Sequence, residues 1–328
     1  RLRSRGLGDV YKRQVRSNVL GKPMKEPQDV PFEKEGQYLK SDNRSNISYF
    51  LEHNVLLRRF TLSVGVLANY NSALNEGIHF YPGIDASYRI GDNFRLYGSW
   101  NRALRMPTFT DLYYEGKTNK GNPDLKPEES EAFEVGLKYN TYFLRAHIAG
   151  FYRKGKNMID WVKEKPEDIW ESQNLTKVDN LGFETNLSLL PRELGNERFF
   201  IRKIELGYAF IHQDKDSEGY ISNYALDYLK HKFTAQLSHS IWKGFSATWY
   251  VRWQDRAGSY TKYENLKPAY EEPYAPYCLV DMKVNWEYQR LNLYAELNNL
   301  LNSTYYDLGN IPQPGIWFKA GFRYSFKY

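Results

Sequence analysis

Apolar and polar residues alternate along most of this chain with a period of two. In the segment Val280–Tyr288 (VDMKVNWEY), apolar residues occupy every second position, and Asp, Lys, Asn and Glu lie between them. The segments 244–254 (GFSATWYVRWQ) and 316–326 (IWFKAGFRYSF) follow the same pattern. This is the period of a β-strand with one apolar face. No segment carries a helical i, i+3, i+4 stripe over three turns, so the pattern predicts an all-β protein.

Thirteen segments carry this alternation, and most are about twice as long as the usual ~5–6-residue strand of a globular protein. Their length suits a tilted strand that crosses a bilayer, which needs about 9–11 residues. The predicted strands are 44–57, 59–69, 79–90, 94–103, 131–140, 143–153, 178–190, 200–212, 228–241, 245–257, 277–288, 290–300 and 315–326.

The connections between these strands alternate in length. Short ones such as LR, GDN, NT, KG and QR are followed by long ones at 71–78, 104–130, 154–177, 213–227, 258–276 and 301–314. In an antiparallel meander, this alternation places all the long loops at one end. Transmembrane β-barrels have that arrangement, and their lipid-facing residues alternate with residues that face the lumen. The sequence therefore predicts an antiparallel transmembrane β-barrel.

Aromatic residues at apolar positions beside the short turns favour the same interpretation, because aromatic girdles mark the interfaces of a membrane barrel. These residues are Phe60, Tyr88, Phe94, Tyr139, Phe245 and Trp286. A soluble β-sandwich or propeller is the alternative, since its strands alternate too. Its strands would be shorter, and a propeller would repeat every ~40–50 residues, a repeat that this sequence lacks.

The formal net charge of +6 does not indicate a nucleic-acid partner. Residues 1–14 (RLRSRGLGDVYKRQ) carry five basic residues and one acidic residue, so the rest of the chain carries only +2. This opening segment lacks the alternation and resembles translated sequencing-adapter DNA, so we expect it to be non-native or unstructured. A solvated basic strand end or loop is the alternative. The single cysteine, Cys278, excludes an intrachain disulfide, and no run of about 18 apolar residues predicts a membrane helix.

An odd number of antiparallel strands cannot close into a barrel, because the first and last strands would be parallel. Open edges in hydrocarbon leave backbone groups unpaired, at a cost of several kcal/mol each. We therefore expect an odd number of strands to precede this segment, which makes the chain the C-terminal part of a larger barrel. Residues 15–43 are expected to be a loop or strand remnant, and residues 44–328 the barrel portion.

Two motifs resemble those of the TonB-dependent outer-membrane receptors. The first is NRALRMPTFTDLYY followed by GNPDLKPEESEAFEVGLKY, and the second is LYAELNNLLNSTYYDLGNIPQPGIWFKAGFRYSF at the C-terminal end. The second motif departs from the family pattern at Leu301 and Ile316. The resemblance implies a 22-stranded barrel that encloses an N-terminal plug. This chain would hold the strands from the tenth onward, without the plug, the TonB-binding box and the signal peptide.

The same resemblance implies a function. It predicts energised import of a scarce chelated nutrient, such as siderophore-iron or cobalamin, across the outer membrane of a Gram-negative bacterium. The implied partners are TonB, outer-membrane lipid, the small chelate and a surface lipoprotein, but no nucleic acid. A passive outer-membrane channel or adhesin barrel is the membrane alternative, and a soluble carbohydrate-binding β-domain is the other.

Candidate ligand contacts lie in the long loops, which the resemblance places outside the cell. Aromatic side chains suit a bulky, partly apolar ligand, and an arginine can pair with a carboxylate or phosphate. The candidates are Arg105, Phe109, Tyr113, Tyr114, Trp161, Trp170, Tyr263 and Tyr270. A structural role is the alternative for the candidates of the 104–130 loop, since prolines stiffen this loop and its motif would fix loop packing and strand register. Trp161 would then cap its strand at the outer interface.

No residue pattern indicates catalysis, a resident metal or a cofactor. Glu264, Glu271 and Glu272 would suit calcium, but three acidic residues in a solvated loop usually bind nothing. The six histidines show no ligand spacing, and no Ser-His-Asp order, P-loop or nucleotide fingerprint occurs. We therefore expect a protein that is not an enzyme and holds no cofactor.

Overall fold

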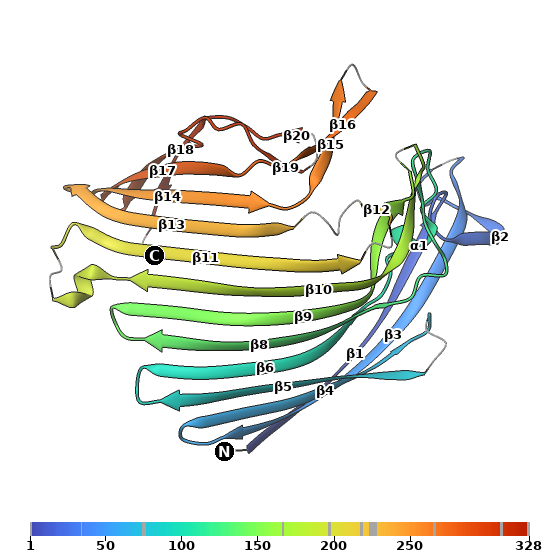
Figure 1. The fold of residues 1–328 in the computed structure, drawn as a ribbon, viewed down its shortest axis with the longest axis horizontal. Coiled ribbons are helices and arrows are strands. Elements are labelled where there is room, and N and C mark those ends of the chain that lie inside the picture. The colour runs from blue at the N-terminus through green and yellow to red at the C-terminus, as the bar shows by residue number, and fades with distance from the viewer. Residues whose placement is uncertain are drawn as a thin grey trace.

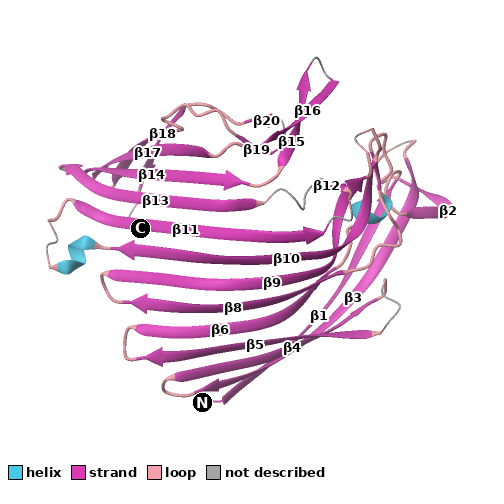
Figure 2. Cartoon of the chain, in the orientation of Figure 1, coloured by secondary structure: helices cyan, strands magenta, loops and turns pink. Residues whose placement is uncertain are grey.

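The computed structural model describes residues 2–33, 35–73, 77–165, 167–195, 198–216, 219–222, 228–264, 267–308 and 311–326. Most of them lie in β-strands (Figures 1 and 2). The long strands are β1 (Leu2–Ser17), β3 (Gln37–Leu56), β4 (Phe60–Asn71), β5 (Ile78–Ile90), β6 (Phe94–Arg105), β8 (Glu128–Asn140), β9 (Leu144–Lys163), β10 (Trp170–Leu189), β11 (Ile201–Asp216), β13 (Leu229–Trp242), β14 (Phe245–Arg256), β17 (Tyr277–Tyr288), β18 (Leu291–Asn298) and β21 (Trp317–Tyr324).

The remaining elements are short. The short strands are β2 (Lys22–Asp29), β7 (Asn119–Lys120), β12 (Ile221–Ser222), β15 (Ser259–Glu264), β16 (Lys267–Pro273), β19 (Tyr306–Leu308) and β20 (Ile311–Pro312). The helical elements are α1 (Phe109–Tyr113) and the single 3-10 turn η1 (Pro191–Leu194). Within the described ranges, no helix has the length and apolar character that a membrane span requires.

The fourteen long strands form one antiparallel meander, in which each long strand pairs with the next one along the chain. All thirteen predicted strands are present, and β1 adds a fourteenth beside β3. The argument from an odd strand number therefore no longer holds, because it set β1 aside. Two open edges remain, since no ladder joins β21 to β1 in the part of the chain that the structure describes.

Long and short connections lie at opposite ends of this curved sheet, as predicted (Figure 1). We call the end that carries η1 and the tight turns the short-turn rim. The other end is the long-loop rim, which carries α1, β2 and the β15–β16 hairpin. The alternation of loop lengths therefore correctly predicted that the long loops lie at one end of the sheet.

One face of the sheet is apolar and uncovered. Val135, Ile148 and Leu181 lie on neighbouring strands, and their side chains are 59%, 52% and 56% exposed. A continuous exposed apolar surface of this kind is typical of a lipid-facing wall. The opposite, polar face carries the residues between these positions.

The six aromatic residues expected beside the short turns form three cross-strand pairs at the short-turn rim. Phe60 lies opposite Tyr88, Phe94 opposite Tyr139, and Phe245 opposite Trp286. The ring centroids of the second and third pairs are 4.6 Å and 6.0 Å apart. Cross-strand aromatic pairs stabilise a sheet and help to fix its register. The pattern in the sequence therefore identified both the residues and their level in the sheet.

Residues 1–14, expected to be non-native or unstructured, lie in a strand over their described part. Residues 2–17 form β1 and pair with β3 along the whole strand. An edge strand needs only backbone hydrogen bonds to its neighbour, so it forms without apolar alternation. The prediction that this segment is not part of the natural sequence concerns its origin and stays a prediction. The 15–43 remnant contains β2 and the start of β3.

The predicted 154–177 loop is mostly strand. β9 and β10 continue past the rest of the sheet and pair as far as Val162 and Glu171. Two short strands add to this extension: β12 pairs antiparallel with β9, and β7 pairs parallel with β10. The main sheet therefore extends into the long-loop rim.

Candidate functional site

The connection between β6 and β8 is a folded unit at the long-loop rim. Its helix α1 begins with a capping box, in which Thr108 Oγ1 accepts a hydrogen bond from Asp111 N at 3.1 Å and Asp111 Oδ2 accepts one from Thr108 N at 2.9 Å. Such a box satisfies backbone donors at the start of a helix. The PTFTD sequence thus sets the path of this loop.

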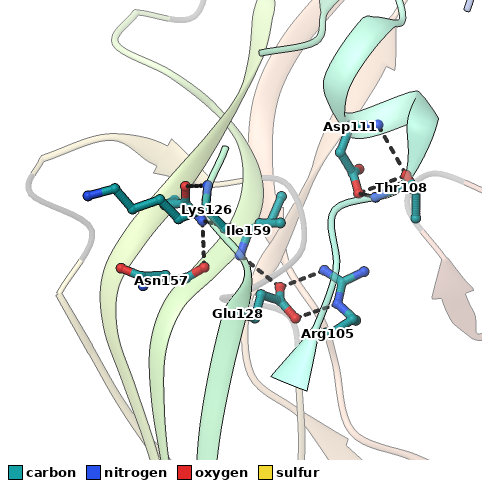
Figure 3. A network of polar contacts seen from close by, with 8 residues as sticks. Arg105, Thr108, Asp111, Lys126, Glu128, Asn157 and Ile159 are labelled. Atoms are coloured by element: carbon teal, nitrogen blue, oxygen red, sulfur yellow. Dashed lines mark hydrogen bonds and ion pairs between the residues drawn. The ribbon is translucent and has the colours of Figure 1, made fainter. Parts of the chain in front are cut away.

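Arg105 and Glu128 join the two ends of that loop (Figure 3). The Arg105 guanidinium donates two hydrogen bonds to the Glu128 carboxylate, one from Nε to Oε2 and one of 2.5 Å from Nη2 to Oε1. Glu128 Oε1 also accepts a hydrogen bond from Ile159 N on β9 at 2.8 Å. The bond to Glu128 raises the pKa of Arg105. Arg105 is thus already occupied by a carboxylate of its own chain.

The end of the loop is also attached to the β9–β10 hairpin. Asn174 Oδ1 accepts a hydrogen bond from Lys126 N at 2.8 Å, and Asn174 Nδ2 donates to the Lys126 carbonyl at 2.9 Å. Asn174 Nδ2 lies 2.6 Å from the Asn157 carbonyl, to which it also donates. The loop and the hairpin are therefore held as one body.

The start of the loop is attached to β3. Tyr113 Oη donates a 2.7 Å hydrogen bond to Asp42 Oδ2, and Arg44 Nη1 donates a 2.6 Å bond to the Pro107 carbonyl. The Arg44 guanidinium lies over the Phe109 ring, 4.9 Å from its centroid. Burial and the neighbouring Asp42 raise the pKa of Tyr113.

The two candidate tryptophans lie on the extended hairpin rather than in a loop. Trp161 on β9 is only 8% exposed and packs edge-on against Tyr114, with ring centroids 6.5 Å apart. Trp170, at the start of β10, is partly exposed, and Lys163 Nζ lies 4.5 Å from its ring centroid. Trp161 is therefore part of the loop core, whereas Trp170 retains an accessible surface.

Tyr263 and Tyr270 lie on the separate β15–β16 hairpin, where they are 54% and 50% exposed. Its base is fixed by a cluster of tyrosines. Tyr260 lies 5.2 Å from Tyr274 and 5.2 Å from Tyr306 between ring centroids. The hairpin projects from the long-loop rim (Figure 1).

A cavity of about 700 Å³ lies against the polar face between β3 and β6, next to the β6–β8 loop. Three asparagines on its wall are joined by hydrogen bonds. Asn69 Nδ2 donates to Asn46 Oδ1 at 3.0 Å and to Ser48 Oγ at 2.8 Å, and Asn71 Nδ2 donates to Asn46 Oδ1 at 3.3 Å. We call Asn46, Asn69, Asn71 and Ser48 the amide ladder.

The described residues contain no group of three or more His, Cys, Asp or Glu side chains arranged to hold a metal ion. Glu271 accepts hydrogen bonds from Ser259 and Thr261, and Glu272 pairs with Lys262 at 2.7 Å. Glu271 and Glu272 thus have partners within the hairpin. The Glu264 side chain lies outside the described residues.

The structure brings five of the eight candidate residues together: Arg105, Phe109, Tyr113, Tyr114 and Trp161. Their partners Asp42, Arg44 and Glu128 and the amide ladder were not identified from the sequence. Polar residues at alternate positions of 44–48 (RSNIS) were the available signal, because a polar position near a long loop faces the lumen of a barrel.

Comparison with known proteins agrees with this architecture. The family model "TonB dependent receptor-like, beta-barrel" matches residues 6–300. A vitamin B12 transporter, BtuB of Vibrio vulnificus, is 26% identical over 52% of this chain and 36% of its own length. The ferrienterobactin receptor of Escherichia coli is 22% identical over 82% of this chain and 38% of its own length. The chain thus spans less than half the length of these relatives.

Solved structures show the same fold. A point mutant of the ferric enterobactin receptor PfeA of Pseudomonas aeruginosa superposes with a TM-score of 0.72 at 18% identity, over 97% of this chain and 50% of that one. The siderophore receptor PirA of Acinetobacter baumannii gives 0.73 at 16% identity, over 99% and 52%. The meander is thus the wall of an outer-membrane β-barrel, and the chain belongs to the family of TonB-dependent receptors.

Proposed function

We propose that this receptor imports a scarce chelated nutrient across the outer membrane and that TonB supplies the energy for import. The observation that carries the proposal is the family match over residues 6–300, together with relatives named as vitamin B12 and ferrienterobactin proteins. The cavity on the polar face supports it, because its volume of about 700 Å³ is in the range of small-molecule sites.

Five of the candidate residues are assigned to the ligand-contacting surface: Phe109, Tyr114, Trp170, Tyr263 and Tyr270. Tyr114 is 38% exposed and Tyr263 is 54% exposed, which leaves ring surface for a partly apolar ligand. Arg105, Tyr113 and Trp161 are assigned a different role, which is to hold the loop in the conformation that presents these rings.

A passive channel is the competing function for a membrane barrel. It would let solute through without an energy source, so uptake of a labelled chelate separates the two functions. Cells that express the complete gene should accumulate ⁵⁵Fe-siderophore or ⁵⁷Co-cobalamin, and an uncoupler or deletion of the host's TonB should abolish that uptake. Uptake that persists without TonB and without a proton gradient would contradict active import.

A further inference from the structure

The tight turns at the short-turn rim carry an excess of positive charge. The connections of two or three residues at this rim are 57–59, 91–93, 141–143, 243–244 and 289–290. They contain one acidic residue, Asp92, and four basic residues, Arg58, Arg59, Lys243 and Arg290, which we call the rim bases. We propose that the rim bases bind the phosphate groups of anionic phospholipids in the periplasmic leaflet, which the short turns of such barrels face.

The first observation is that an exposed apolar residue lies beside the rim bases in each turn that carries them. These pairs are Leu57 with Arg58, Trp242 with Lys243, and Tyr288 with Arg290. The three apolar residues are 58% to 65% exposed, and Lys243 Nζ lies 5.2 Å from the centroid of the Trp242 ring. Apolar or aromatic side chains combined with basic ones anchor a membrane protein at the level of the lipid headgroups.

The second observation is the depth of the rim bases along the wall. Arg59 directly precedes Phe60, and Lys243 lies two residues before Phe245. Both phenylalanines belong to the aromatic pairs of this rim. A strand rises about 3.3 Å per residue, so these bases lie within about 7 Å of the aromatic pairs. The headgroup layer adds roughly 5–7 Å to each side of the hydrocarbon core, so the rim bases lie at its depth.

The third observation is that the rim bases have no carboxylate partner. All four are exposed, and none of them forms an ion pair with any residue that the structure describes. Arg102 and Arg105, toward the long-loop rim, both pair with glutamates. A free guanidinium can hold a phosphate through two parallel hydrogen bonds, and the positive excess favours an anionic lipid over a zwitterionic one.

The lipid-facing wall determines why the partner is a lipid. The turns that carry the rim bases join strands whose apolar face is uncovered, as at Val64 on β4 and Leu293 on β18, which are 43% and 40% exposed. Phospholipid headgroups therefore surround these turns in the membrane. The proposal concerns this lipid contact and does not depend on which nutrient is imported.

The test uses the receptor expressed from its complete gene and reconstituted in phosphatidylcholine vesicles. Brominated lipids quench tryptophan fluorescence on contact, so Trp242 can report on the lipids at this rim. Its quenching is the difference between a receptor and its Trp242→Phe counterpart. Brominated phosphatidylglycerol should associate with the Trp242 site at least about threefold more strongly than brominated phosphatidylcholine.

Two variants that remove the same charge at opposite rims decide the assignment. Replacement of all four rim bases with glutamine should bring the preference for phosphatidylglycerol close to one. The matched control replaces four exposed lysines of the long loops with glutamine and should retain the preference. These lysines are Lys22, Lys25, Lys117 and Lys165.

Equal quenching of Trp242 by the two brominated lipids would overturn the proposal. A preference that survives in the rim-base variant, or that both variants reduce equally, would overturn the assignment to these four residues. If the rim-base variant does not insert into vesicles, the salt dependence of the unmodified receptor decides. Charges are screened beyond about 3 Å at 1 M salt, so the preference should disappear there, and its persistence would contradict recognition by charge.

Discussion

At the scale of single residues, Glu128 is the centre of the long-loop rim. Its carboxylate is buried, and it accepts hydrogen bonds from Arg105 on β6 and from the Ile159 backbone on β9. Replacing it with alanine leaves a guanidinium and a backbone N–H without their acceptor. Because unpaired groups of this kind are costly, we expect Glu128→Ala to lower the free energy of unfolding by about 1–3 kcal/mol.

The measurement for Glu128 is the rate of limited proteolysis in the 104–130 loop, together with the denaturant midpoint. Glu128→Gln retains an acceptor for Ile159 N but loses the charge, so its effect should be smaller. Glu115→Ala is the control, because that side chain is 75% exposed in the same loop. Equal proteolysis of the Glu128→Ala and Glu115→Ala variants would show that Glu128 does not hold the loop.

Tyr113 should make the same loop sensitive to alkaline pH. Burial and Asp42 raise its pKa in the folded protein above the unfolded value of about 10. The folded state then holds the phenol proton more tightly, so its contribution to stability is complete below about pH 10 and is lost as the pH rises toward the folded pKa. The protection of the α1 amides from hydrogen exchange, corrected for the intrinsic base-catalysed rate, should therefore fall above about pH 10. Tyr113→Phe has no phenol proton to lose and should show a weaker pH dependence, and an unchanged profile would contradict this role.

The pairings at the long-loop rim were harder to predict from the sequence than the positions of the strands. Arg105, Tyr113 and Trp161 were singled out as ligand contacts by residue type. The structure engages each with a partner distant in sequence: Glu128, Asp42 and Tyr114. Such pairings depend on which strands are neighbours and on how far the strands extend beyond the membrane. The alternation of apolar and polar residues does not encode these two properties outside the membrane-crossing part of a strand.

At the scale of the strand, close aromatic–glycine contacts shape the polar face. A Cβ added to Gly136 on β8 would lie 2.5 Å from the Tyr97 hydroxyl on β6. That hydroxyl donates to Glu134 at 2.7 Å and lies 2.7 Å from His147 Nε2, so the ring cannot move away without loss of these bonds. We expect Gly136→Ala to destabilise the barrel by about 1–3 kcal/mol, the usual cost of overpacking.

Gly150 provides the matched control for Gly136. It lies on the neighbouring strand β9, opposite Val135, and an added Cβ would meet only the Gly182 carbonyl at 3.9 Å. Gly150→Ala should therefore have little effect on the denaturant midpoint of the receptor in lipid vesicles. If both variants shift the midpoint equally, the cost comes from the backbone of the strand and not from the contact with Tyr97.

Strand positions were predictable because the bilayer imposes a period of two on every crossing segment. The same reasoning failed where the bilayer ends. β9 and β10 continue to Lys163 and from Trp170 with mixed polar side chains, and β1 pairs with β3 without any apolar alternation. The extension of β9 packs against the β6–β8 loop, as Trp161 does against Tyr114, and β1 is an edge strand paired through its backbone, so neither follows the period that the bilayer imposes.

At the scale of the whole molecule, the wall is a single layer, and its two faces must therefore meet different surroundings. Val284 and Asn285 are adjacent on β17, and their cross-strand partners differ accordingly: Ala247 and Ala295 for Val284, and Ser246 and Tyr294 for Asn285. Val284→Arg places a charge against lipid and should cost about 2–4 kcal/mol, whereas Asn285→Arg places it in the polar interior and should be tolerated. Urea titration of the complete receptor in lipid vesicles, followed by tryptophan fluorescence, measures both. Equal losses would mean that the apolar face does not contact the bilayer. A larger loss for Asn285→Arg would reverse the assignment of the two faces.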